Sequence, residues 1–102
     1  MGSVIADLAD HAGVTLWYAA GLELVPAREA EAFVDACIET GMRILGIEGF
    51  EVRGDVVRPD MSAIADFSAL YDARTSADEA RQFLSSIDAG DLAFEFVLAE
   101  DP

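Results

Sequence analysis

The sequence predicts an α+β domain in which two helices cover one face of a four-stranded antiparallel sheet, preceded by a short N-terminal helix. Three observations predict this fold. Apolar residues alternate with a period of two over residues 14–24 and 92–99, as in half-buried strands. They recur at helical spacing over residues 26–45 and 76–89. A glycine-containing turn between two apolar runs makes residues 49–59 typical of a hairpin.

One domain spanning residues 1–102 is expected. A chain of 102 residues is close to the commonest size of a single domain. Hydrophobic residues make up 53% of the chain, more than a disordered segment carries. The sequence shows no internal repeat, linker or low-complexity tract, so nothing divides it further.

The first two elements are a short helix and a strand. Residues 3–12 predict a helix that Gly13 ends. The strand over 14–24 carries larger residues on one face, namely Val14, Leu16, Tyr18, Ala20, Leu22 and Leu24. Trp17 belongs to the other face, among the residues Thr15, Ala19, Gly21 and Glu23. That second face should therefore point away from the helices.

The first long helix is predicted over residues 26–45. Pro26 suits a first helical position because its missing N–H has no helical partner there. The apolar stripe consists of Ala30, Phe33, Val34, Cys37, Ile38, Gly41 and Leu45. The opposite side carries Arg28 and the acidic residues Glu29, Glu31, Asp35 and Glu39. Gly46 is expected to end the helix at the latest.

The hairpin over 49–59 turns at Gly54-Asp55, where glycine allows a positive φ. This register pairs Val52 with Val57 and Glu51 with Arg58.

Residues 60–73 fit two structures. Asp60, which follows a proline, suits a helix cap, whereas Ile64 to Phe67 equally suit a strand. We favour a bend at Pro59-Asp60 followed by an extended segment.

The second long helix and the last strand close the domain. Ser76 and Glu79 have the spacing of a capping box, which predicts a helix over 76–89 with Gly90 as its left-handed cap. In the strand over 92–99, one face carries Leu92, Phe94, Phe96 and Leu98. The other carries Ala93, Glu95, Val97 and Ala99.

The order strand, helix, strand, strand, helix, strand matches the ferredoxin-like split β-α-β arrangement. This arrangement leaves one face of the sheet without helices. Trp17, surrounded by small residues there, indicates either a homodimer interface or a partner site. The alternatives are a cover formed by residues 3–12, which is equally favoured, and a bulge that breaks the alternation.

Charge is the most unusual property of the chain. There are 20 acidic residues against six arginines and no lysine, which gives a net charge of −14. Such a surface repels nucleic acid and anionic lipid and attracts a basic protein. An adaptation to high salt or a GC-rich genome would produce the same composition, and we weigh these causes equally with a functional one.

No catalytic, metal or cofactor site is expected, and the chain is predicted not to be an enzyme. His11 and Cys37 are the only histidine and the only cysteine, so no triad or zinc spacing exists. Asp66, within an apolar segment, is the best candidate for a shifted pKa, although a carboxylate accepting backbone N–H groups in a turn is the favoured interpretation. The lone cysteine and the lack of a signal-peptide pattern predict a cytoplasmic protein.

The candidate partner-binding residues are the exposed aromatic residue and the acidic residues of the first long helix and last strand. They are Trp17, Glu29, Glu31, Asp35, Glu39 and Glu95. An alternative is a homodimeric domain that binds a small ligand or has a regulatory role.

Three short stretches, 44–50, 58–60 and 64–68, together resemble a pattern in small bacterial proteins, some of them immunity proteins of toxin–immunity pairs. The resemblance covers about a quarter of the chain. It implies an inhibitor that masks a toxin domain, often a basic nuclease, with acidic side chains. It assigns no individual contact residue.

Overall fold

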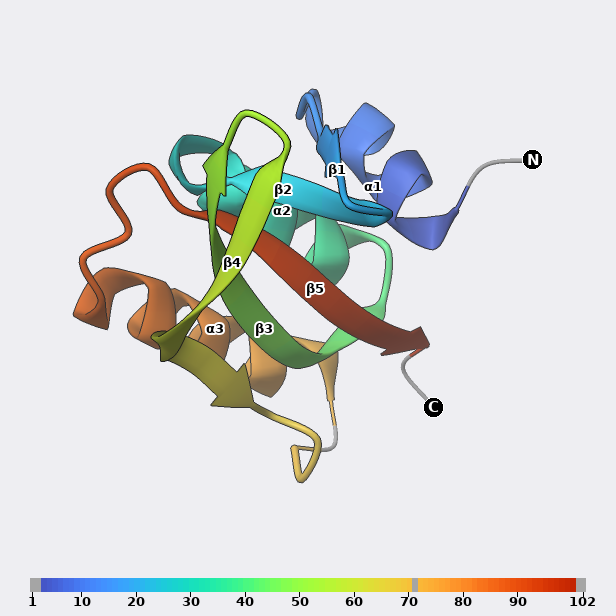
Figure 1. Cartoon of the computed structure of the whole chain (residues 1–102). Helices are drawn as coiled ribbons and strands as arrows, with labels where there is room; N and C mark the ends of the chain where they lie inside the picture. The colour runs from blue at the N-terminus through green and yellow to red at the C-terminus, as the bar shows by residue number, and fades with distance from the viewer. Residues whose placement is uncertain (1–2, 71, 101–102) are drawn as a thin grey trace.

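The computed structural model describes residues 3–70 and 72–100 and has an α+β architecture (Figure 1). Its elements are α1 (Val4–Ala12), β1 (Trp17–Ala19), β2 (Leu22–Pro26), the 3-10 helix η1 (Ala27–Glu29), α2 (Ala30–Glu39), β3 (Met42–Arg53), β4 (Val56–Asp66), α3 (Ala73–Ser86) and β5 (Ala93–Glu100). The strands form one sheet in the order β1-β2-β5-β3-β4, and all neighbours are antiparallel. The predicted α+β class is therefore confirmed.

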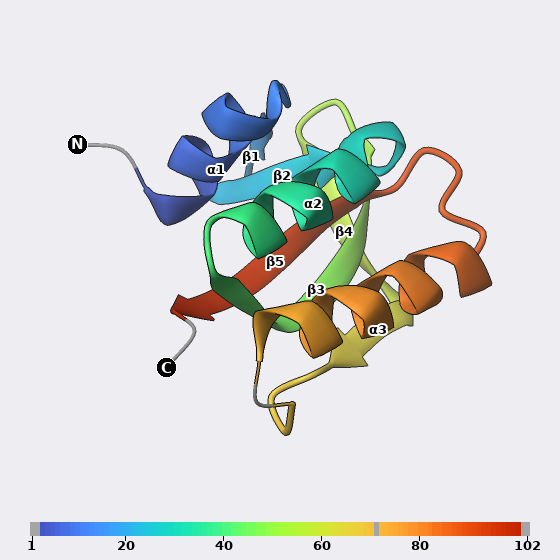
Figure 2. The same cartoon turned by 180° about the vertical axis from the view of Figure 1, so that it is seen from behind.

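The helices α1, α2 and α3 lie on the same face of the sheet, and Figure 2 shows them in front of the strands. The main core fills the space between these helices and the sheet. Phe33 of α2, Ile44 of β3 and Phe94 of β5 are fully buried there. The Phe33 and Phe96 rings lie 4.7 Å apart between centroids. Burying large side chains supplies most of the favourable free energy of folding, so this face holds the domain together.

The helix α1 belongs to this covered face. Ser3 caps it by accepting a hydrogen bond from the Ala6 N–H, and the Ser3 hydroxyl donates to Glu23 of β2 at 2.6 Å. Leu8 and Ala9 of α1 are buried in the main core. Because α1 packs on the helix side, residues 3–12 do not cover Trp17.

The strand number and order depart from the ferredoxin-like prediction. That prediction has four strands, whereas the structure has five, with β5 between β2 and β3. In the ferredoxin-like order β5 would be an edge strand. β5 suits a central position because both of its faces carry apolar residues, Phe94 and Phe96 on one and Ala93 and Val97, on either side of Glu95, on the other.

The fifth strand arises because residues 14–24 form a hairpin, and the prediction of one continuous strand is wrong. Ala20 and Gly21 both have positive φ, 52° and 78°, as a two-residue type I′ turn requires. The turn pairs Trp17 with Leu24. These two residues therefore share one face, whereas simple alternation placed them on opposite faces.

The helix predicted over 26–45 begins later and ends earlier. Pro26 is the last residue of β2, and α2 ends at Glu39. Gly41 then adopts a left-handed φ of 71°, which reverses the chain into β3. Ile44 continues the helical spacing in sequence but lies in a strand, because its side chain reaches the same core from β3.

The β3–β4 hairpin has the predicted register. The turn falls at Gly54-Asp55, and the pairs are Val52 with Val57 and Glu51 with Arg58. The extended segment after Pro59 is confirmed, since β4 runs to Asp66. The predicted bend at Pro59-Asp60 is a shift in the pairing of β3 with β4, because Phe50 pairs with Pro59 whereas Glu48 pairs with Ile64. Within the shifted segment the Ser62 N–H donates to the Asp60 carboxylate at 3.0 Å.

The close packing at this shift depends on Gly49. A Cβ at position 49 would lie 2.7 Å from the Ala63 Cβ and 3.2 Å from the Phe94 ring. No other residue fits between β4 and β5 at that point without displacing one of them.

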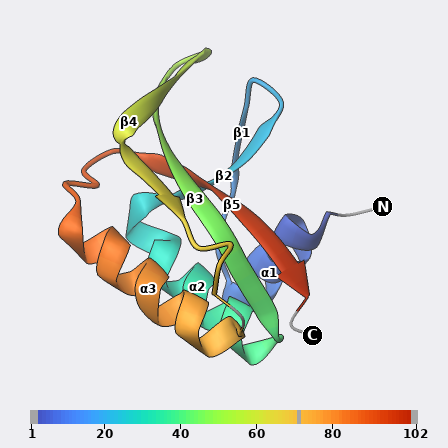
Figure 3. The same ribbon diagram turned by 90° about the horizontal axis from the view of Figure 1, so that it is seen from below.

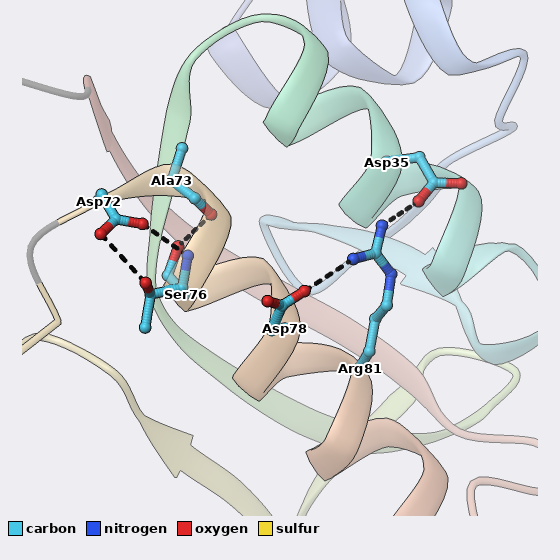
Figure 4. A network of polar contacts seen from close by, with 7 residues as sticks. Asp35, Asp72, Ala73, Ser76, Asp78 and Arg81 are labelled. Carbon is cyan, nitrogen blue, oxygen red and sulfur yellow. Dashed lines mark hydrogen bonds and ion pairs between the residues drawn. The ribbon is translucent and has the colours of Figure 1, made fainter.

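The N-cap of α3 lies four residues before the predicted cap, Ser76. Asp72 is the N-cap and accepts a hydrogen bond from the Thr75 N–H (Figure 4). Ser76 is fully buried, and its hydroxyl donates to Ala73 O and accepts from the Ile44 N–H at 3.0 Å. The predicted capping serine instead joins α3 to β3. The helix also ends at Ser86, three residues before the predicted boundary.

Candidate functional site

A second, smaller apolar cluster lies on the face of the sheet that has no helices. Its buried members are Leu24, Phe50 and Ala93. Partly buried side chains surround them, namely Trp17, Leu22, Val52 and Val57. We call these seven residues the open-face cluster.

Alternation along the strands places this cluster opposite the helices. On β5, Ala93 belongs to the open-face cluster and its neighbour Phe94 to the main core. On β2, the adjacent Leu24 and Val25 divide in the same way. Successive side chains of a strand point to opposite faces, so the two clusters lie on the two sides of one sheet. Figure 3 shows the β1–β2 and β3–β4 hairpins extending on the side away from the helices.

Two carboxylates border the cluster. Glu48 of β3 is paired directly with Glu95 of β5, one pair beyond the Gly49–Phe94 pair and two beyond Phe50–Ala93. Both therefore share the face of the open-face cluster. Directly opposed like charges destabilise a sheet. Neither carboxylate takes part in an ion pair within residues 3–70 and 72–100.

Exposed apolar side chains extend the same surface. Ile64 of β4 is paired with Glu48 and is 43% exposed. Val97 of β5 is 51% exposed and lies two residues beyond Glu95 on the same face. The open face thus combines a partly buried tryptophan, exposed aliphatic groups and two unmatched carboxylates. Contiguous apolar surface with a polar border is typical of protein-binding sites.

The structure divides the candidate residues between the two sides of the molecule. Trp17 and Glu95 lie on the open face. Glu31, Asp35 and Glu39 are exposed on α2, and Glu29 lies in η1 beside it. The six residues therefore do not form one surface.

Two of the three acidic residues of α2 already have basic neighbours. Asp35 accepts a hydrogen bond from Arg81 of α3, and Arg81 also lies 3.4 Å from Asp78 (Figure 4). Glu39 lies 3.6 Å from the His11 ring. These contacts join α2 to α3 and α1. The negative charge of this side is thus partly balanced within the chain.

The sequence analysis missed Glu48 of the open face, and it placed Phe50 in the predicted hairpin without assigning it to a face. Glu48 lies between the helix predicted over 26–45 and the hairpin predicted over 49–59. The alternation of Glu48, Phe50 and Val52 was the available signal, and it begins before the predicted hairpin does.

Two of the titratable groups singled out in the sequence, Cys37 and Asp66, have shifted pKa values. Burial raises the pKa of the Cys37 thiol to about 12, so the nucleophilic thiolate is scarce at neutral pH. Hydrogen bonds from the Ser68 side chain and backbone lower the pKa of Asp66, which is exposed. Asp66 is thus the turn carboxylate of the favoured interpretation.

No group of three or more His, Cys, Asp and Glu side chains could hold a metal ion in the part of the chain that the structure describes. An open hollow of about 460 Å³ lies between the β3–β4 hairpin and the loop before β5. Its charged lining is Glu51, Arg53, Asp60, Asp88 and Asp91. No helix among the described residues is long and apolar enough to cross a membrane.

Comparisons with models of protein families, with curated proteins and with solved structures find no match to this chain.

Proposed function

We propose that this chain is a non-enzymatic binding protein that associates with a basic protein and inhibits it, in the manner of an immunity protein. The observation that carries the proposal is the open face. There an apolar cluster around Trp17 meets two carboxylates, Glu48 and Glu95, that form no ion pair within residues 3–70 and 72–100, on a chain with a net charge of −14. Interfaces commonly place aromatic anchors at their centre and charges at their rim.

Charge supports a basic partner in particular. A strongly acidic protein repels other acidic proteins and attracts basic ones over roughly 10 Å, the screening length at about 0.1 M salt. Attraction of this kind acts mainly on the rate of association. Raised salt should therefore slow association and leave dissociation less affected.

The test begins with the immobilised chain and an extract of its source organism. Bound proteins are eluted with a salt gradient and identified, and each is purified. We expect a basic protein whose association rate falls at least tenfold between about 20 and 500 mM salt. The chain should also abolish that protein's toxic activity in cells. A partner without excess positive charge, or association that is insensitive to salt, would overturn the proposal.

A melt of the free chain supplies the control. If acidity served only to adapt the chain to salt, the chain would unfold in dilute buffer and regain its fold in molar salt. The proposal expects a folded chain in both.

The second candidate is a homodimer formed through the same open face, with a ligand-binding or regulatory role. The exposure of Val97 and Ile64 on an uncovered sheet favours it. Light scattering on the purified chain separates the two, since the first candidate expects a monomer in the absence of the partner.

A further inference from the structure

We infer that the open face of the sheet, and not the acidic surface of α2, binds the basic partner, and that it receives a segment carrying arginine beside apolar side chains. This inference rests on the proposed function and assigns the surface responsible for it. Three arguments lead to it. They are the ion pairs present on each side of the molecule, the position of Glu48 and Glu95 beside the open-face cluster, and the repulsion that two copies of this face would have for each other.

The two acidic surfaces differ in how their charges are balanced. On α2, Asp35 contacts Arg81 and Glu39 contacts His11, so a partner's cation would compete with groups already present. Glu48 and Glu95 face each other across two strands, and neither forms an ion pair with any residue that the structure describes. Carbons at the base of such opposed side chains lie about 4.5–5.5 Å apart. A guanidinium group bridging them would remove their repulsion as well as gain hydrogen bonds.

The carboxylates stand beside the apolar cluster, which fixes the pattern expected in the partner. Ala93, the next residue of β5 on the same face as Glu95, is buried within the cluster that contains Trp17. Val97 follows on the other side of Glu95 and is exposed. A partner strand that alternates arginine with small aliphatic residues, or a surface with the same pattern, would place cations over the carboxylates and methyl groups beside Trp17. Arginine also stacks on an indole ring.

Charge argues against a second copy of this chain as the occupant. A two-fold dimer through the open face would bring Glu48 and Glu95 of both copies into one interface. Four carboxylates would then be brought together and desolvated, which is costly when no cation pairs with them. The unmatched pair is instead complementary to a basic surface.

Trp17 makes the test direct, because it is the only tryptophan of the chain and lies in the open-face cluster. The probe is a synthetic ten-residue peptide of alternating arginine and valine, titrated at low salt. We expect a saturable shift of the tryptophan emission. A peptide of alternating glutamate and valine is the control for charge and should give no shift.

Two double variants each remove two negative charges, the first from the open face and the second from the helix side. Glu48→Gln with Glu95→Gln changes the open face. Glu31→Gln with Glu79→Gln changes exposed positions of α2 and α3 that have no ion-pair partner in residues 3–70 and 72–100. The first pair should weaken peptide binding at least tenfold, and the second less than threefold. Thermal melts of both variants establish that they are folded.

The outcomes separate this inference from the proposed function. Equal weakening by both pairs, or binding without a change in Trp17 emission, would overturn the open face as the surface. Dimerisation of the free chain that Trp17→Glu abolishes would replace the basic segment by a second copy and also overturn it. A basic natural partner that both double variants weaken equally would leave the function standing and remove only this surface. A natural partner that is not basic would remove the function whatever the peptide shows.

Discussion

The two faces of the sheet are built differently. The helix face buries its largest side chains completely, among them Phe33, Phe94 and Ile44, and its buried hydroxyl, Ser76, both donates and accepts hydrogen bonds. The open face buries three residues, leaves Trp17 partly exposed and sets Glu48 against Glu95. The complete burial of these side chains and the paired hydroxyl on the first face both favour folding. The opposed carboxylates and the partly exposed tryptophan on the second face do not, and such departures from the rules of stability are expected at functional sites.

Removing one aromatic side chain from each face tests this difference most strongly. Phe33→Ala opens a cavity in a fully buried site and should lower the free energy of unfolding by about 3–5 kcal/mol. Trp17→Ala should cost less than half as much, because part of that ring already contacts water. Denaturant titrations followed by circular dichroism measure both.

Equal costs would contradict the comparison, since they would make the open-face cluster part of the folding core. A change of denaturant slope in one variant would signal an altered unfolded or native ensemble, and the comparison would then be repeated with Phe33→Leu and Trp17→Phe.

The next test concerns polar groups of the helix face. Ser76→Ala leaves the Ile44 N–H buried without an acceptor and should destabilise the domain by about 1–3 kcal/mol. Ser86→Ala is the control, since its exposed hydroxyl donates to Phe83 O near the end of the same helix and should change stability by less than about 0.5 kcal/mol. Amide exchange of Ile44 supplies a local readout, which should accelerate in the first variant. If Ser76→Ala left the free energy of unfolding unchanged, this would show that a water molecule replaces the hydroxyl as acceptor.

The sequence predicted the elements better than their arrangement, for physical reasons. Periodicity found the strands and helices because each buries one face against a common core. The predicted helix extended beyond the end of α2 because Leu45 continues the helical spacing, although Gly41 has already reversed the chain. The strand order depends on which distant strands pair, and this is decided by packing across the whole sheet rather than by local pattern. The central position of β5 could be recognised only by comparing both of its faces.

The candidate site was predicted in part. Alternation placed Trp17 away from the helices, where it lies, but the reversal at Ala20-Gly21 was missed because the turn lacks the usual asparagine. The acidic residues of α2 were conspicuous in the sequence. Their contacts with Arg81 and His11 join segments that are distant in the chain, so sequence reasoning overestimated them as free charges. Glu48 was overlooked because its partner Glu95 is likewise far away.

The smallest expected effect concerns the turn that carries Trp17 onto the open face. Ala20 holds a φ of 52°, a conformation that costs a residue with a Cβ about 1–2 kcal/mol and that asparagine adopts more readily. Ala20→Asn should therefore raise the free energy of unfolding by about 0.5–1 kcal/mol. Ala32→Asn, at an exposed position within α2, should lower it by about 0.5 kcal/mol because asparagine is the poorer helix former. If alanine-to-asparagine raises the free energy of unfolding at position 20 and lowers it at position 32, the backbone conformation of each site explains the difference. Two losses would mean that the β1–β2 turn does not hold the left-handed conformation in solution, and that Trp17 reaches the open face by another path.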